Sequence, residues 1–263
     1  MDKLMMNRNQ KIAASFDKAA EFYELHGTLQ KKAAFELYGL LPKWLKGLPP
    51  GPVLELGCGT GLVSQQLVRE LKGFPICLSD LSQAMLLAAQ EKIEAQPQVT
   101  FEKRDANEPL PSQHYSLILS ALALQWLREP AQGVVNFSEA LKPGGKLILS
   151  FMTDASFSEW KAAALDLGLP FSGNALPAPD QVRSALEACP GTLDWKLVNF
   201  KVKFPKTLAF FCNLKAIGAG VRLEESHLNP GQMKRLIQYL DEKNQGGLTM
   251  TSQVAFACYQ RPA

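Results

Sequence analysis

The sequence predicts an α/β fold built on a parallel β-sheet that helices cover on both faces. Short apolar runs alternate with longer amphipathic segments through residues 53–151. The apolar runs are continuous, which is typical of parallel strands buried on both faces. A glycine turn at residues 57–61 also follows the first run directly and precedes a helical pattern. These three observations indicate an open sheet with a ligand site at the carboxyl ends of its strands.

Five runs have the length and composition of buried strands. They are residues 53–56, 75–80, 99–105, 115–122 and 146–151. Helical patterns fall between them at residues 62–71, 82–95 and 131–141, and Pro-Gly-Gly at 143–145 predicts a turn before the fifth strand.

The segments on either side of this core are predicted to be mostly helical. Residues 11–41 contain no proline and carry a helical apolar pattern, which Gly27 divides into two helices. Prolines then predict that the helix ends and a short stiff linker follows; they are Pro42, Pro49, Pro50 and Pro52. After residue 156 we expect helices at 157–168, 180–188, 206–217 and 230–243, and strands at 195–204 and 248–258.

Composition excludes several classes of protein. The 263 residues are 46% hydrophobic and 20% charged, as in a globular protein with a sizeable core. The net charge of +3 argues against a general nucleic-acid binder. The chain has no apolar run long enough for a membrane span and no export signal at its start, so we expect a cytoplasmic protein. Its five cysteines are far apart, which predicts reduced thiols and neither a metal site nor a disulfide framework.

Positive charge gathers in the last quarter of the chain. From Lys196 onward, ten Lys and Arg residues face four Asp and Glu residues. On charge alone a solvated basic face is the simpler interpretation, and a docking site for an acidic partner is the alternative. The candidates for such a site are Lys201, Lys203, Lys206, Lys215, Arg222, Lys234 and Arg235.

The glycine turn has features of a nucleoside site. Gly57 and Gly59 let the backbone turn sharply and let a ligand approach without a Cβ in the way. The spacing GxGxG, completed by Gly61, is not the GxGxxG of dinucleotide enzymes, and no P-loop follows. Glu55 precedes the turn, where a carboxylate would repel phosphate and attract a cation. The turn therefore favours a positively charged nucleoside.

Two acids end the next two strands. Asp80 can accept both ribose hydroxyls, and Asp105, followed by Ala106, can receive an adenine amino group. Leu81 and Met85 follow Asp80 and could enclose the base. Either acid alone could be an ordinary helix cap, but their order after the glycine turn favours a nucleoside site.

These residues resemble the class I S-adenosylmethionine-dependent methyltransferases. The segment from Glu55 to Gly61 matches their first motif, Asp80 and Asp105 match the acids after the second and third strands, and LKPGGKLILS at 141–150 matches the turn into the fifth strand. The resemblance implies a Rossmann-like seven-stranded sheet, mostly parallel, whose last strand at 248–258 is antiparallel. It also implies S-adenosylmethionine as methyl donor and S-adenosylhomocysteine as product. Glu55 would face the ammonium group, with Cys58 in the turn and Ser120 near the sulfonium.

Three further strings resemble the malonyl-acyl-carrier-protein O-methyltransferases of biotin synthesis. They are FDKAAEFYELHGTLQKKAA at 16–34, SALALQWL at 120–127 and NLKAIGAG at 213–220. The resemblance implies one domain over 1–263, with a helical cap at 1–48, a cofactor-binding core at 50–155 and a substrate side with inserted helices at 156–263. Two departures are Ala121, where the family usually has Asn, and residues 246–252, which lack the family's aromatic side chains and keep mainly Thr251.

This family transfers methyl to the free carboxylate of a malonyl group on acyl carrier protein, giving the ester that primes pimeloyl synthesis. A carboxylate is ionised at neutral pH, so no general base is expected. The resemblance implies that Tyr23, His26 and Gln125 position the reactants. Phe16 and Gln30 would contact the cofactor, and Trp126, Lys215 and Arg222 the substrate. We expect no metal, no nucleic acid, no membrane, and a monomer or weak dimer.

Two other functions remain open at this point. The departures at Ala121 and 246–252 suit a methyltransferase acting on a small molecule or quinone precursor with the same core. A cofactor-binding protein without catalysis is the other alternative. RNA methylation ranks low, because the charge is modest and no basic motif with stacking aromatic residues is present.

Overall fold

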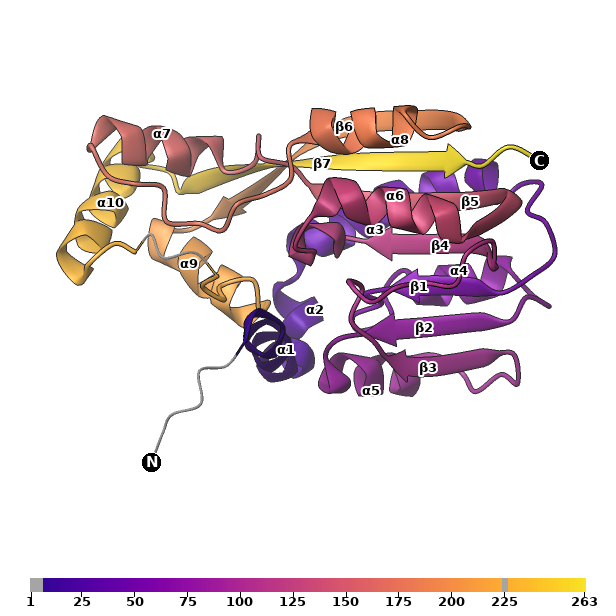
Figure 1. Cartoon of the computed structure of the whole chain (residues 1–263). Helices are drawn as coiled ribbons and strands as arrows, with labels where there is room; N and C mark the ends of the chain where they lie inside the picture. Colours follow the sequence, from indigo (N-terminus) through magenta and orange to yellow (C-terminus); the bar gives the residue numbers. More distant parts are fainter. Residues whose placement is uncertain (1–6, 224–226) are drawn as a thin grey trace.

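The protein is built on one seven-stranded sheet, described here from a computed structural model that covers residues 7–223 and 227–263. The strand order is β3-β2-β1-β4-β5-β7-β6 (Figure 1). The strands are β1 (Val53–Leu56), β2 (Ile76–Asp80), β3 (Val99–Lys103), β4 (Tyr115–Ala121), β5 (Leu141–Met152), β6 (Thr192–Phe204) and β7 (Leu248–Gln260). The first five pair in parallel, whereas β7 is antiparallel to both β5 and β6. The predicted Rossmann-like sheet with an antiparallel last strand is confirmed.

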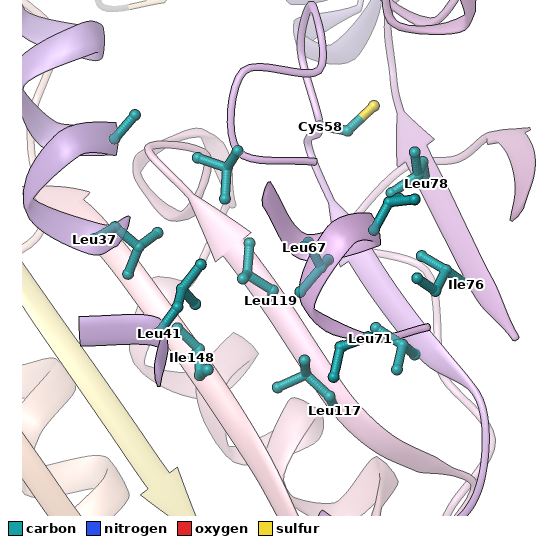
Figure 2. Close-up of a cluster of buried hydrophobic side chains, with 14 of the residues drawn as sticks. Leu37, Leu41, Cys58, Leu67, Leu71, Ile76, Leu78, Leu117, Leu119 and Ile148 are labelled. Atoms are coloured by element: carbon teal, nitrogen blue, oxygen red, sulfur yellow. The ribbon is translucent and has the colours of Figure 1, made fainter. Parts of the chain in front are cut away.

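Helices cover both faces of the sheet, because consecutive apolar residues of a buried strand point to opposite sides. On one face lie α3 (Thr28–Trp44), α4 (Ser64–Glu70) and α5 (Gln83–Lys92). Figure 2 shows leucines of α3 and α4, such as Leu37 and Leu67, beside strand residues such as Leu117 and Ile148. On the other face lie α6 (Pro130–Ala140) and α8 (Pro179–Glu187), packed on residues such as Leu54 and Ile118.

A third group of helices lies beyond the carboxyl ends of the parallel strands, to the left in Figure 1. It contains α7 (Ser158–Asp166), α9 (Thr207–Ala216) and α10 (Pro230–Lys243). Their apolar side chains form a separate core with Leu248 and Met250 of β7. Next to this group lie α1 (Arg8–Ala19), η1 (Ala20–Phe22) and α2 (Tyr23–His26). The remaining short helix, η2 (Leu124–Trp126), follows β4.

The structure corrects two predicted boundaries. The long N-terminal helix does not end before Pro42 but continues to Trp44, because Leu41 and Trp44 are buried against the sheet on either side of the proline. The predicted turn at 143–145 lies within β5, which begins at Leu141. β5 continues through this segment with a shift in its register against β4 and with a left-handed φ of 74° at Gly144. The N–H of Gly144 donates to the carbonyl of Pro262.

Candidate active site

The glycine turn connects β1 to α4 at the carboxyl end of the sheet. Gly57, Gly59 and Gly61 all adopt left-handed φ angles, between 54° and 79°, which side-chain-bearing residues rarely adopt. A Cβ on Gly57 would lie 2.4 Å from the Cβ of Ala123, whereas a Cβ on Gly59 would meet nothing within 4 Å. Gly57 is therefore required by packing, and Gly59 leaves open space where a ligand can approach.

Glu55 lies beneath this turn and is only 1% exposed. Its Oε2 atom is buried and has no hydrogen-bond partner among the described residues. Burial, helped by the nearby charge of Asp80, raises the pKa of Glu55 to about 7. A buried carboxylate with an unpaired oxygen suits a cationic ligand group, which would restore its ordinary acidity.

Asp80, at the end of β2, accepts two backbone hydrogen bonds. The N–H of Gly59 donates to Oδ2 at 2.9 Å, and the N–H of Ser82 donates to Oδ1 at 2.8 Å. Burial raises the pKa of Asp80, although these N–H donors oppose the shift. The carboxylate is thus held at the turn, with its remaining lone pairs facing the cavity that it lines.

That cavity has a volume of about 100 Å³ and collects most of the predicted nucleoside contacts. The predicted residues that line it are Phe16, Gly57, Gly59, Asp80, Leu81, Met85, Asp105 and Ala106. Asp105 is already engaged there, because Asn9 of α1 donates to its Oδ2 and Asn107 donates to its Oδ1.

Helix α1 closes the small cavity. Asn9, Ile12, Ala13 and Phe16 line it from one face of the helix. Asp17 fixes the helix to the start of α5 by accepting hydrogen bonds from Ser82 Oγ at 2.5 Å and from the Ala84 N–H at 3.1 Å. Small-molecule sites commonly measure about 300–1,000 Å³, so this cavity is small with α1 in its present position.

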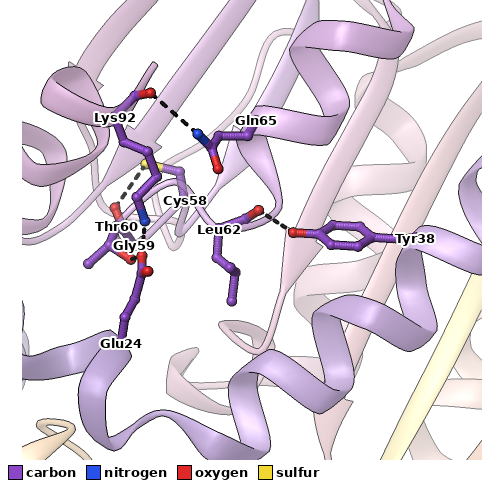
Figure 3. Close-up of polar contacts among 8 residues, drawn as sticks. All are labelled: Glu24, Tyr38, Cys58, Gly59, Thr60, Leu62, Gln65 and Lys92. Atoms are coloured by element: carbon purple, nitrogen blue, oxygen red, sulfur yellow. Dashed lines mark hydrogen bonds and ion pairs between the residues drawn. The ribbon is translucent and has the colours of Figure 1, made fainter.

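The segment after α1 is tied to the glycine turn and to α5 (Figure 3). Thr60 Oγ1 donates to Glu24 Oε1 at 2.6 Å, and Lys92 forms an ion pair with the same carboxylate. Tyr38 of α3 donates its hydroxyl hydrogen to the carbonyl of Leu62. These contacts hold Tyr23 and its neighbours over the carboxyl end of the sheet.

Four side chains line both this cavity and a second, larger one: Phe16, Tyr23, Leu122 and Trp126. The ring of Phe16 packs edge to face on Trp126, with centroids 5.3 Å apart, and lies 6.4 Å from the ring of Tyr23. Leu122 has a left-handed φ of 53°, a strained conformation that is frequent at functional sites. We call these four side chains the partition, since a group passing between the cavities must pass them.

The larger cavity has a volume of about 850 Å³ and extends from the partition to the core formed by α7, α9 and α10. The other predicted residues that line it are Gln30, Gln125, Lys215 and Arg222. Gln125 donates from Nε2 to the carbonyl of Leu122 at 2.7 Å, while its Oε1 is buried without a partner. The wall combines aromatic and aliphatic side chains with polar and basic groups, as in many sites for small organic molecules.

Five predicted residues line neither cavity. Glu55 lies beneath the turn, and Cys58 is buried within it. Gly61 packs against α5, where an added Cβ would lie 3.3 Å from Ala89. Ser120 donates from Oγ to the carbonyl of Leu56 at 3.0 Å. The carbonyl of His26 accepts a hydrogen bond from Asn213 Nδ2 at 2.8 Å, which joins α2 to α9.

Sequence reasoning missed several residues that shape the site. Asp17 lies inside the recognised N-terminal string, but nothing local shows that it faces α5. Gly218, in the string NLKAIGAG, has a φ of 75°, and a Cβ there would lie 2.9 Å from the ring of Phe16. Its carbonyl also accepts a hydrogen bond from Ser15 Oγ at 2.8 Å. The glycine therefore lets α1 pack closely on the end of α9.

The described residues contain neither a metal-binding cluster nor a helix that could span a membrane. Within residues 7–223 and 227–263, no cluster of three His, Cys, Asp or Glu side chains is arranged to bind a metal ion. No helix in the same part of the chain combines the length and apolarity needed to span a bilayer.

The chain is similar to known methyltransferases in sequence. A family model described as "Methyltransferase domain" matches residues 54–147. The biotin biosynthesis bifunctional protein BioCD of Bordetella avium is 32% identical over 97% of this chain, which spans only 53% of that longer protein. The malonyl-[acyl-carrier protein] O-methyltransferase of Magnetococcus marinus is 27% identical over 97% of this chain and 94% of its own length. The malonyl-[acyl-carrier protein] O-methyltransferase of Marinomonas sp. is 26% identical over 98% of this chain and 96% of its own length.

Solved structures share the fold at lower identity. A phosphoethanolamine N-methyltransferase of Haemonchus contortus, in complex with S-adenosyl-L-methionine, matches 100% of this chain and 62% of its own with a TM-score of 0.61 and 16% identity. A methyltransferase structure from Bacillus halodurans matches 86% of this chain and 99% of its own, with a TM-score of 0.60 and 17% identity. These likenesses concern the sheet and its covering helices.

Proposed function

The chain is an S-adenosylmethionine-dependent methyltransferase, and on that premise we propose that it methylates the free carboxylate of a malonyl group carried by acyl carrier protein. The product would be the methyl ester from which the pimeloyl chain of biotin is built. The full-length relatives that carry this name support the acceptor. The observation that carries the proposal is the partition, where a nucleoside cavity and a larger organic cavity share four side chains.

The residues of the small cavity, together with Glu55 beneath the glycine turn, fit the methyl donor. The unpaired Oε2 of Glu55 would take the ammonium group, Asp80 the ribose hydroxyls, and Leu81 and Met85 the faces of the adenine. The open space above Gly59 leaves room for the chain that joins them. When bound, S-adenosylmethionine supplies a methyl group activated by a positively charged sulfur.

The chain's own residues would then align and enclose the acceptor. A malonyl carboxylate is already a nucleophile at neutral pH, so the site needs orientation rather than proton removal. Burial and the charge of Asp80 raise the pKa of Tyr23 well above its ordinary value, so its hydroxyl stays protonated and can donate a hydrogen bond. Phe16 and Trp126 exclude water at the partition, which strengthens such contacts. Gln30 and Gln125 add polar contacts on the acceptor side.

His26 has a less direct role in this proposal. Because it lines neither cavity and its carbonyl is bonded to Asn213, it would position α2 against α9 rather than contact a reactant. Lys215 and Arg222 border the large cavity, where they can face an anionic part of the acceptor.

The second candidate, a methyltransferase acting on a small molecule or quinone precursor, is not favoured by the names of the relatives. Ala121 lines the small cavity, and Met250 and Ser252, in a stretch that departs from the family string, line the large one. The acceptor side thus differs from the recognised pattern at positions that face the cavities. Thr251 instead turns to Glu159, which accepts its backbone N–H at 2.9 Å.

A transfer assay separates these candidates. Purified protein is incubated with S-adenosylmethionine labelled on the methyl group and with malonyl-carrier protein, malonyl-CoA, or a panel of phenols and quinone precursors. We expect a methyl ester on the malonyl thioesters, identified by its release in mild base. Bound cofactor with no transfer to a malonyl thioester would reject the proposal, and transfer to the phenolic panel would establish the second candidate.

The proposal also covers location and assembly. The carrier protein and the five free cysteines suit the reducing cytoplasm. For assembly we propose a monomer or weak dimer.

A further inference from the structure

We propose that a row of cations on α1, with Lys215 of α9, is the docking surface for the acidic face of the carrier protein. The inference rests on the proposed function, because the carrier is the partner that the function requires. The surface consists of Arg8, Lys11, Lys18 and Lys215, and we call it the α1 surface.

The two faces of α1 serve different cavities. Asn9, Ile12, Ala13 and Phe16 face the small one, following helical spacing. Arg8, Lys11, Ser15 and Lys18 recur on the neighbouring face and line the large cavity instead. The helix that closes the cofactor site thus presents its cations at the acceptor cavity.

These cations are free to meet a partner. Lys11, Lys18 and Lys215 are exposed, and none of the four takes part in an ion pair within the described residues. Arg8 donates only long hydrogen bonds, of 3.4 and 3.5 Å, to the carbonyls of Leu127 and Trp126. Its Nε is buried and has no partner among the described residues, so Arg8 contributes to the surface through its terminal nitrogens and its charge.

Two acidic residues near the row are engaged elsewhere. Asp17 precedes Lys18 but is turned toward α5, where Ser82 and Ala84 donate to its carboxylate. Glu24, further along the chain, is paired with Lys92. Glu21, three residues after Lys18, is exposed and forms no ion pair within the described residues, but the four cations outnumber it and the α1 surface keeps a net positive charge.

The length of the α1 surface indicates which kind of partner it fits. From Arg8 to Lys18 is ten residues, and a rise of about 1.5 Å per residue gives about 15 Å along the helix. One phosphate contacts only a small part of that length, whereas acidic side chains along a partner helix can match all of it. The contact between Ser15 and Gly218 holds the C-terminal half of α1 beside the end of α9, which adds Lys215 to the same edge. An acidic helical carrier fits this arrangement, with its thioester arm entering the cavity.

The basic residues of β6 provide a matched control. Val202 and Phe204 line the large cavity, so Lys201 and Lys203, which alternate with them, point to the opposite face of the strand. They carry the same charge but lie off the cavity entrance.

The test compares the double variant K11E/K18E with K201E/K203E, both checked for wild-type melting temperature and cofactor affinity. Three substrates are used: malonyl-carrier protein, malonyl-CoA, and malonyl-pantetheine, which has neither protein nor phosphate. We expect K11E/K18E to raise KM for the carrier substrate at least tenfold, to flatten its dependence on salt, and to leave malonyl-pantetheine within twofold of wild type. K201E/K203E should behave as wild type on all three.

Three outcomes would overturn the inference. They are an unchanged KM for the carrier substrate, an equal rise for all three substrates, and equal rises for carrier and CoA that indicate recognition of phosphate alone. Binding of fluorescently labelled carrier protein is measured in parallel. A chain that methylates no malonyl thioester would refute the proposed function, while weaker carrier binding by K11E/K18E alone would still support the surface.

Discussion

The ring of Phe16 packs edge to face on the ring of Trp126, with centroids 5.3 Å apart, although 110 residues separate them in the chain. Both side chains line the small cavity and the large one. One comes from the helix that closes the cofactor site and the other from η2 after β4. The wall shared by the two cavities is thus built from two segments that meet only in the folded chain.

Glu55→Gln should remove a pH dependence of stability. The pKa of Glu55 is raised to about 7 in the folded protein, from 4.5 when exposed. The folded state therefore binds an extra proton between these values, and the free energy of unfolding falls as pH rises through 4.5 to 7, by roughly 3 kcal/mol in total. Denaturant unfolding of the cofactor-free protein at pH 5 and pH 8 measures this fall.

In Glu55→Gln, the part of the fall in unfolding free energy that Glu55 causes should be absent, because the amide does not titrate. It should also bind S-adenosylhomocysteine less tightly at pH 7 and release no proton from this site on binding, as measured by calorimetry in two buffers. An identical fall in the variant would show that Glu55 is not the titrating group.

Gly57→Ala and Gly59→Ala should fail in different ways. Alanine at Gly57 adds a Cβ that would lie 2.4 Å from the Ala123 Cβ, so we expect a loss of about 2–4 kcal/mol in unfolding free energy. Alanine at Gly59 meets open space and should cost about 1–2 kcal/mol from its left-handed φ. Its methyl group enters the small cavity, so cofactor affinity should fall at least about tenfold. Equal cofactor affinity in Gly59→Ala and wild type would contradict a ligand path over this glycine.

Asp17→Ala should let α1 open more easily. The carboxylate accepts hydrogen bonds from Ser82 Oγ and the Ala84 N–H, and both are lost in the variant. We expect cofactor dissociation in stopped-flow experiments to accelerate by about tenfold, or about 1.4 kcal/mol. Asp17→Asn, which keeps one acceptor oxygen, should be intermediate, and Glu21→Ala serves as an exposed control on the next segment. A wild-type rate in Asp17→Ala would mean that α1 does not limit release.

Tyr23→Phe should lower kcat without adding a limb to the pH–rate profile. The raised pKa keeps the hydroxyl protonated, so Tyr23 can donate a hydrogen bond but does not act as a base. Loss of one such bond predicts a fall in kcat of about tenfold, or about 1–1.5 kcal/mol. Tyr38→Phe is the matched control, because its hydroxyl bonds the carbonyl of Leu62 outside both cavities. Unchanged turnover in Tyr23→Phe would leave Tyr23 as a wall of the partition only.

Much of the core could be predicted because its signals are local. A buried strand, a glycine turn and a helix follow one another in sequence, so β1, the turn and α4 were recognisable. Asp80 and Asp105 end adjacent parallel strands, and parallel strands bring their carboxyl ends to one edge. The helix through Pro42 was not predictable in the same way, since burial of Leu41 and Trp44 against the sheet overrides the local effect of the proline.

The acceptor side was predicted less completely, because its residues act through distant contacts. Lys201 and Lys203 are candidates for a docking site in the sequence, yet they alternate with Val202 and Phe204, which face the large cavity. Lys11 and Lys18 lie in an N-terminal segment whose charge gave no such indication. Only the packing of α1 on α9, through Ser15 and Gly218, brings them to the entrance.

The sequence by itself determined the sheet, its glycine turn and the acids that indicate a nucleoside methyl donor, since these depend on neighbouring residues and on strand direction. Tertiary structure decided how the two cavities meet, because the partition combines α1, α2, the end of β4 and η2. It also decided the charge state of Glu55, since desolvation depends on everything packed around the carboxyl group. The donor is encoded locally, whereas the path to the acceptor exists only once distant segments have packed.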